Sequence, residues 1–330
     1  MAKEVIVSAI QASGNVHIGN YIGAIQQFVK LQDKYQGYFF IADLHALTEP
    51  QDPEKLRKQI LDSAALYMAC GLDPKEAVIF IQSQVPEHTE LGWILNTITP
   101  LGELERMTQF KDKSKKRKNI LAGLLNYPTL MAADILLYDA DLVPVGKDQS
   151  QHLEFTRTVA RKFNSKFGVT FKEPRALLKK EGALIMGLDN PSNKMAKSAQ
   201  SPNNYIAILD EPNEIQRKIK IAVTDSGKEI KYDPVKKPAI SNLLIIYSAM
   251  SGKSIKNLES KFKEKTYAEF KSSLADLLVE KLSPIQKEYK RLIENKGELL
   301  KVLNNGKEQA QKVARTTMLD VRKKIGLLCE

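Results

Sequence analysis

Short apolar runs alternate with longer amphipathic stretches over the first 150 residues of the chain. Three of the runs, Glu4 to Ile10, Tyr38 to Asp43 and Ala77 to Gln82, predict buried strands. Between them, apolar residues recur every three or four positions, as on one face of a helix. Strands that alternate with helices predict an α/β fold, a Rossmann-like parallel sheet with helices on both faces.

Two helices are marked by apolar residues at helical spacing: Ile18, Ile22, Ile25 and Val29 in the first, and Leu56, Ile60, Ala64 and Met68 in the second. The second also has end signals, since Asp52 can cap its N-terminus, Pro53 suits its first position and Gly71 suits its end. Ligands bind such sheets beyond the carboxyl ends of the strands. Chemistry is therefore expected where a strand turns into a helix.

The C-terminal part has a different character. The segment Asp189 to Asn204 is crowded with Asn, Pro, Ser and Lys, which predicts a mobile loop. Beyond it, Leu243 to Met250, Leu274 to Leu282 and Pro284 to Ile293 predict helices, the last capped by Ser283. Residues 205–330 hold 25 Lys and Arg against 17 Asp and Glu, most of the net charge of +11. This excess indicates either a polyanionic partner or a solvated lysine-rich surface.

Composition narrows the class of protein. A chain of 330 residues, 43% of them hydrophobic, can form a large domain and a smaller one. No apolar run approaches the roughly 20 residues of a membrane helix, and the N-terminus lacks the pattern of a signal peptide, so we expect a cytoplasmic protein without membrane contact. The cysteines, Cys70 and Cys329, are too few for a disulfide framework or a four-cysteine zinc site, and the four histidines lie in separate segments. No structural metal is expected.

The first predicted strand ends in Gln11-Ala12-Ser13-Gly14, and His17-Ile18-Gly19-Asn20 opens the first helix. The glycines allow a nucleotide to approach the backbone closely, and the helix N-terminus offers free N–H groups to phosphates. His17 adds a donor beside them. An ordinary strand-to-helix turn would have the same pattern.

A second basic element, Lys194-Met195-Ala196-Lys197-Ser198, lies in the predicted loop. Two lysines on a flexible segment can close over a triphosphate and follow the charge that moves to the leaving pyrophosphate. Alone, the element would indicate only a basic surface loop. Together with His17 to Asn20, it resembles the two signatures of the class I aminoacyl-tRNA synthetases.

Three further stretches resemble the bacterial tryptophanyl-tRNA synthetase family, and the resemblance covers nearly the whole chain. They are Gly102 to Lys111 (GELERMTQFK), Leu130 to Tyr138 (LMAADILLY) and Val143 to Gln149 (VPVGKDQ). The resemblance implies a nucleotide-binding catalytic domain over residues 1–199, with a dimerisation segment inserted at about 48–110. It also implies a helical tRNA anticodon-binding domain over 200–330, whose last helix packs back on the catalytic domain.

The spacing of Tyr127, Met131 and Asp134 supports this resemblance, because residues four and three apart share one face of a helix. A carboxylate beside an aromatic ring and a thioether forms an apolar slot with one acceptor, which suits an indole N–H. The alternative is a core-packing helix in which a neighbour pairs with Asp134.

The resemblance assigns roles to single residues. It places Asp134 on the indole nitrogen, with Met131 and His45 near the pocket and Tyr127 and Gln149 near the polar end of tryptophan. It implies phosphate contacts, with magnesium, from Lys111, Lys194 and Lys197, and a donor from His17. The ATP site would comprise Gln11, Ala12, Ser13, Gly19, Asn20, Gly146, Lys147, Asp148, Ile185, Lys194, Met195, Ala196, Lys197 and Ser198. For His45, a satisfied buried histidine is an equal alternative.

The expected reaction forms tryptophanyl-adenylate from L-tryptophan and ATP and then loads tRNA(Trp), with a homodimer as the assembly. The basic run Lys111 to Lys118 is either an RNA contact or a solvated loop. Three alternatives stay open at this point: a tyrosyl-tRNA synthetase, a non-catalytic RNA-binding relative, and a pantothenate-synthetase-like ligase. Trp93, the sole tryptophan, is expected in the core or in a subunit interface.

Overall fold

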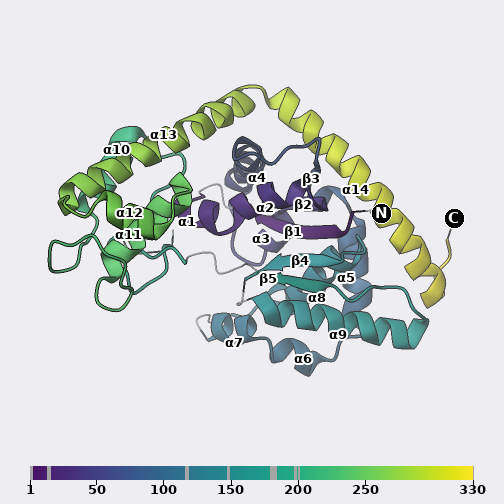
Figure 1. Ribbon diagram of the computed structural model, residues 1–330. Helices are drawn as coiled ribbons and strands as arrows, with labels where there is room; N and C mark the ends of the chain where they lie inside the picture. The colour runs from purple at the N-terminus through teal and green to yellow at the C-terminus, as the bar shows by residue number, and fades with distance from the viewer. Residues whose placement is uncertain are drawn as a thin grey trace.

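The computed structural model describes residues 3–12, 16–115, 119–146, 149–178, 184–196, 199 and 201–329. Five strands form a parallel sheet in the order β3-β2-β1-β4-β5, near the centre of Figure 1. The strands are β1 (Val5–Gln11), β2 (Gln36–Ala42), β3 (Ala77–Ile81), β4 (Leu142–Val145) and β5 (Arg175–Leu178). The three predicted strands are present, with ends shifted by one or two residues, and the predicted α/β fold is confirmed.

The order in which the chain adds strands to the sheet reverses at β1: β2 and β3 lie on one side of it, and β4 and β5 lie on the other. β1 pairs with β2 along its whole length, but with β4 only through Ile6 and Leu142. Pro144 of β4 cannot donate a backbone hydrogen bond, which suits a strand that is not paired on that side. The carboxyl ends of β1 and β4 therefore separate, and a gap of this kind is the usual ligand site of an open parallel sheet.

Helices cover both faces of the sheet and continue into a helical C-terminal part (Figure 1). In the first part they are α1 (Ile18–Asn20), η1 (Tyr21–Ile25), α2 (Gln26–Gln32), α3 (Asp43–Ala46), α4 (Pro53–Ala69), η2 (Gln82–Gln84), α5 (Glu87–Thr97), α6 (Leu101–Glu105), α7 (Thr108–Ser114), α8 (Ala122–Leu136) and α9 (Ser150–Phe167). In the C-terminal part they are η4 (Pro202–Asn204), α10 (Pro212–Ile221), α11 (Pro238–Ser251), α12 (Ile255–Lys261), α13 (Tyr267–Glu294) and α14 (Lys296–Ile325). No described helix is long and apolar enough to cross a membrane.

Two buried apolar clusters occupy the two faces of the sheet. Side chains alternate along a strand, so the neighbours Phe39 and Phe40 enter different clusters. The first cluster packs β-strand residues against α2 and α4 and continues into α10, α11 and α13. The second packs the opposite face against α5, α8 and α9. The helical part is thus continuous with one face of the sheet.

The last helix, α14, covers the edge strand β3. Leu299 and Leu303 from its first half are buried in the first cluster, whereas Ala314 and Met318 from its second half are buried in the other. Between them, Gly306 lies directly on the backbone of Ile79 in β3. The helix thereby closes both apolar clusters at an edge that would otherwise expose its pairing groups.

We expect Gly306→Ala to destabilise the fold. The new Cβ would overlap the Ile79 backbone carbonyl, so α14 would have to move away from β3. Overpacking of this kind costs about 1–3 kcal/mol of unfolding free energy. Gly297→Ala, in the same helix, is the matched control because its Cβ would meet only Asn295 Oδ1 at 3.9 Å. Urea denaturation checks the prediction, and equal midpoints for the two variants would contradict it.

Two predicted helices in the C-terminal part are helical, but the break between them and the Ser283 cap are wrong. Residues 274–282 and 284–293 belong to the single helix α13, with Pro284 in its interior, and Ser283 caps nothing. The N-terminus lies at Thr266, whose hydroxyl accepts from the Glu269 N–H while the Glu269 carboxylate accepts from the Thr266 N–H. Buried Leu278, Leu282 and Ile285 form one apolar face across the proline. Their burial outweighs the roughly 3 kcal/mol cost of an interior proline.

The first two predicted helices are also found. α4 begins after Asp52, whose side chain accepts from the Lys55 N–H at 2.8 Å, and Gly71 follows its end with φ +107°. The first helix is not a uniform α-helix, since a π-helical segment, η1, separates α1 from α2. Trp93 is 69% exposed on α5, so the core is excluded as its position.

Candidate active site

The first signature, His17 to Asn20, forms the start of α1, and residues 206–208 bind its backbone. His17 is the residue before the helix and is buried. The Ile18 N–H donates to the Ile206 carbonyl at 2.9 Å, and the Ile208 N–H donates to the Val16 carbonyl at 2.9 Å. These bonds hold the start of α1 against the chain that leads into the helical part.

The second signature lies on a short hairpin-like segment. Met186 and Lys194 form an antiparallel bridge, and the Met195 N–H donates to the Ile185 carbonyl at 3.0 Å. Asn242 of α11 binds this segment with both atoms of its amide. It accepts from the Met186 N–H and donates to the Met186 carbonyl, both at 2.9 Å. Lys194 is thus carried by a segment that is fastened to the helical part.

The two signatures meet in a cavity of about 1290 Å³. His17, Gly19 and Asn20 line one side, and Lys194 and Met195 line another. The remaining lining residues are Gly23, Ala24, Val145, Gly146, Leu184, Ile185, Met186, Pro191, Tyr232, Pro234, Pro238, Ser241, Asn242, Ile245, Ser248, Ala249 and Ile255. The apolar part of this lining suits a purine base, and His17, Asn20 and Lys194 offer donors to phosphates.

Gly19 lines the cavity where His17 and Met195 both lie close to its backbone. A Cβ there would come within 2.9 Å of His17 Nδ1 and 3.5 Å of Met195 Sδ. The position therefore keeps the imidazole and the second signature close together. Any side chain would displace the His17 ring.

We expect Gly19→Ala to lower kcat/KM for ATP by roughly 10- to 100-fold, because small displacements of catalytic groups have effects of this size. Gly23→Ala is the matched control, since Gly23 lines the same cavity and its Cβ would meet nothing within 4 Å. Steady-state pyrophosphate exchange at varied ATP measures both variants. Equal values for Gly19→Ala and Gly23→Ala would refute the steric role of Gly19.

Several other residues that the resemblance assigns to ATP or its phosphates do not line the cavity or lie outside the described residues. Gln11 ends β1 and Ala12 follows it, and neither lines the cavity; the Gln11 carbonyl accepts from the Ser63 hydroxyl. The Ala196 N–H donates to Asn204 Oδ1. Lys111 is exposed on α7 and is absent from the cavity lining. Ser13, Lys147, Asp148, Lys197 and Ser198 lie outside the described residues.

The carboxylate of Asp134 is buried near the end of α8, where it is 2% exposed and accepts three side-chain hydrogen bonds. Oδ1 lies 2.7 Å from Gln82 Nε2 and 2.6 Å from His88 Nδ1. Oδ2 lies 2.7 Å from His45 Nε2. His45 and Gln82 follow the carboxyl ends of β2 and β3, so the sheet places them at the same edge as the cavity residues.

Asp134 is ionised at neutral pH. Burial alone would raise the pKa of this carboxyl, but the positive charge of His45 and the hydrogen bonds from His45 and His88 outweigh it and lower the pKa to about 2. A carboxylate oxygen can accept two hydrogen bonds. From the described residues, Oδ1 accepts two hydrogen bonds and Oδ2 accepts one, which leaves one acceptor position on Oδ2 by this count.

His45, the described partner of Oδ2, also contacts the ring of Tyr127. The His45 side chain is 21% exposed, and its ring stands edge-on to Tyr127 with centroids 6.5 Å apart. The Tyr127 hydroxyl lies 2.7 Å from His152 Nε2 and 3.3 Å from Gln109 Oε1. Burial raises the pKa of Tyr127 to about 12, so it stays protonated. Two residues of this face of α8, Tyr127 and Asp134, therefore lie against His45, whose side chain is partly exposed.

Comparison with known proteins decides the family. The profile described as tRNA synthetases class I (W and Y) matches residues 2–283. A tryptophan–tRNA ligase of Caldanaerobacter subterraneus subsp. tengcongensis is 53% identical over 323 residues, 98% of each chain. The chain belongs to the bacterial tryptophanyl-tRNA synthetases. The synthetase of Mycoplasma pneumoniae superposes with a TM-score of 0.90 at 37% identity over 99% of both chains. That of Campylobacter jejuni, solved with ADP and tryptophan, superposes at 0.86 with 39% identity over 98% of this chain and 100% of that one.

The alternatives in which neighbours pair with Asp134 and with His45 agree with the structure, since His45, Gln82 and His88 all bind the Asp134 carboxylate. The roles of Asp134 and His45 in binding the indole stay predictions. Gln149 precedes α9, and its N–H donates to the Gly146 carbonyl. This bond joins Gln149 to a loop that lines the cavity.

Sequence reasoning missed Gln82, His88 and Asn242. Gln82 is the last residue of the third predicted strand, and a polar residue at the carboxyl end of a strand was a usable signal. His88 and Asn242 gave no such signal, because their partners are 46 and 56 residues away in sequence.

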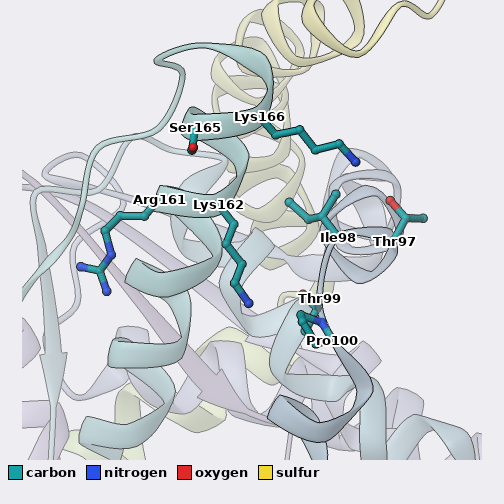
Figure 2. A pocket seen from close by; sticks show the side chains of 8 residues that line it. All are labelled: Thr97, Ile98, Thr99, Pro100, Arg161, Lys162, Ser165 and Lys166. Carbon is teal, nitrogen blue, oxygen red and sulfur yellow. The ribbon is translucent and has the colours of Figure 1, made fainter.

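A second hollow, of about 670 Å³, lies between α9 and the segment Thr97 to Pro100. Figure 2 shows Lys162 and Lys166 extending from α9 beside this segment, whereas Arg161 points away. Arg161 pairs with Glu173 at 2.7 Å and Lys162 with Glu103. The predicted site residues do not line it, and its paired cations give no reason to place substrate there.

Proposed function

We propose that the chain activates L-tryptophan with ATP to tryptophanyl-adenylate and pyrophosphate and then transfers tryptophan to tRNA(Trp). The observation that carries this is the single open acceptor position on buried Asp134, at the same sheet edge as a cavity lined by both signatures. An indole N–H can fill such a position; a phenol O–H is also a donor, so the choice of tryptophan over tyrosine is supported by the relatives rather than by this acceptor. The tryptophan ligase names of the close relatives support the same substrate.

In the first step, a carboxylate oxygen of tryptophan attacks the α-phosphorus of ATP and pyrophosphate leaves. No side-chain nucleophile is needed, so the protein contributes orientation and charge stabilisation. His17 and Lys194 line the cavity and stabilise the phosphate oxygens, and we assign the same role to Lys197 and Lys111 from the family resemblance. A ribose hydroxyl of the terminal tRNA adenosine then attacks the adenylate carbonyl, and AMP leaves.

Magnesium enters with ATP as part of the substrate. The described residues that line the cavity include no Asp or Glu, so their donors are neutral or cationic. Such a lining suits the phosphates of ATP, and the phosphate oxygens themselves supply the hard oxygen ligands that Mg²⁺ prefers.

Residues 1–199 form the catalytic domain in this proposal, and 200–330 form the anticodon-binding domain. The basic excess of the second region suits RNA, and Asn242 and residues 206–208 tie it to both signatures. We place the protein in the cytoplasm, where translation consumes its product.

The proposed assembly is a homodimer formed through the segment at about 48–110. Trp93 of α5 and Leu101 of α6 are 69% and 60% exposed there, and large exposed apolar side chains favour an interface. Sedimentation of the purified protein would show a mass near 74 kDa, twice the 37.1 kDa chain. A monomer at micromolar concentration would contradict this part of the proposal.

Charging of tRNA tests the proposed function. Purified protein, ATP, Mg²⁺ and radiolabelled tryptophan are incubated with tRNA(Trp) or tRNA(Tyr) transcripts. Acid-precipitable label is expected only with tRNA(Trp), and excess chelator should abolish it. Failure to charge tRNA(Trp) under conditions that form adenylate would refute the transfer step.

A further inference from the structure

The hydrogen bonds of Asp134 continue through His88 to Tyr138. His88 is fully buried, and its two ring nitrogens face different partners. Nδ1 lies 2.6 Å from Asp134 Oδ1, and Nε2 lies 2.7 Å from the Tyr138 hydroxyl. Tyr138 is itself buried at 1% exposure and stacks on Tyr38 with ring centroids 4.8 Å apart. The His88 ring therefore has little freedom to rotate.

These contacts determine which nitrogen bears the proton. Asp134 is ionised, so it can only accept, and His88 Nδ1 must donate to it. Burial raises the pKa of Tyr138 well above its usual value, so the hydroxyl keeps its proton and can donate to Nε2. With Nδ1–H donating to Asp134, a Tyr138 hydroxyl that donates to Nε2 fits the Nδ1–H tautomer of His88.

Gln82 completes the arrangement. Its Nε2 donates to Asp134 Oδ1 at 2.7 Å, and the residue is 0% exposed. Gln82 and His88 together occupy both acceptor positions of Oδ1. A ligand N–H can therefore bind only at Oδ2, on the side of His45.

We propose that His88, fixed by Tyr138 as the Nδ1–H tautomer, is a positioning residue that directs the indole N–H to Asp134 Oδ2. This inference rests on the proposed role of Asp134. His88 does not touch tryptophan; it orients the carboxylate and blocks the other oxygen. The selectivity of the pocket for an N–H donor then depends on a side chain one layer behind it.

Two His88 variants test this. His88→Leu removes the donor at similar volume, whereas His88→Asn can place its amide N–H where Nδ1–H was. Each is assayed by pyrophosphate exchange with tryptophan and with the benzothienyl analogue of tryptophan, in which sulfur replaces the N–H. His88→Leu should raise KM for tryptophan by roughly 10-fold or more, the effect of one hydrogen bond to a charged group. Its KM for the analogue, its kcat and its KM for ATP should change less than threefold, about the size of ordinary context effects.

His88→Asn should recover most of the tryptophan affinity, which a purely structural role would not require. Tyr67→Phe is the control, a buried hydroxyl deletion on α4 in the opposite cluster. Equal losses for tryptophan and the analogue, or no rescue by asparagine, would overturn the inference. If the unaltered enzyme failed to prefer tryptophan over the analogue, the role of Asp134 itself would fall.

A direct measurement does not depend on variants. Histidine labelled with ¹⁵N gives only four pairs of ring signals in this chain. We expect His88 to show a protonated Nδ1 and an unprotonated Nε2, and Tyr138→Phe to disturb that pattern. A proton on Nε2, or on both nitrogens, would contradict the proposed tautomer.

Discussion

Asp134→Ala should lower kcat/KM for tryptophan in pyrophosphate exchange by about 10²- to 10⁴-fold, because a site built around a substrate hydrogen bond loses this much without it. The substitution removes the acceptor for the indole. It also leaves Gln82, His88 and His45 without their common partner. The loss should fall mainly on tryptophan, with KM for ATP much less affected.

Stability must be measured beside activity for this variant. The pKa of Asp134 lies below its ordinary value, so the ionised group stabilises the fold above about pH 4. That contribution is lost as the pH falls through about 2. At neutral pH the variant therefore lacks it entirely, and assays must be made below its melting temperature. Asp276→Ala, at an exposed position on α13, is the control. Near-normal tryptophan turnover by folded Asp134→Ala would refute the assignment.

Lys194→Ala should slow adenylate formation by about 10²- to 10³-fold, the usual effect of removing one group that stabilises transition-state charge. Lys194 lines the cavity opposite His17 and is exposed, so its removal leaves no buried group unpaired. Tryptophan binding should be nearly unchanged, because Lys194 lines the cavity, whereas the described partners of Asp134 are His45, Gln82 and His88. Single-turnover kinetics separate the two quantities.

The control for this variant is Lys301→Ala, an exposed lysine on α14. It should leave both quantities unchanged. If Lys194→Ala weakened tryptophan binding as much as it slowed the chemical step, Lys194 would not be a transition-state contact. A binding effect of that size would point instead to a disturbed segment around Met186.

Local patterns predicted most of the sheet and the face of α8. Strand and helix spacing depend on neighbouring residues, so β1, β2, β3 and the end signals of α4 were accessible from the sequence. The shared face of Tyr127, Met131 and Asp134 follows from helix geometry alone. The single helix α13 was not accessible, because a proline is a strong local signal and only tertiary burial overrides it.

The supporting contacts of the site were beyond local reasoning. The second layer, His88 and Tyr138, depends on how α5 and α8 pack on the sheet. The clamp of Asn242 on Met186 depends on the fold of the whole helical part. The roles of Lys197, Lys147 and Asp148 stay predictions, since these residues lie outside the described part of the chain.

Pyrophosphate exchange into ATP, driven separately by tryptophan and by tyrosine without tRNA, tests the substrate most directly. We predict exchange with tryptophan alone, because Asp134 Oδ2 can accept an indole N–H and the similar relatives are tryptophan–tRNA ligases. Exchange driven by tyrosine instead would keep the reaction and contradict the proposed substrate. Exchange with neither amino acid would contradict adenylate formation itself and favour an RNA-binding protein that has kept the fold.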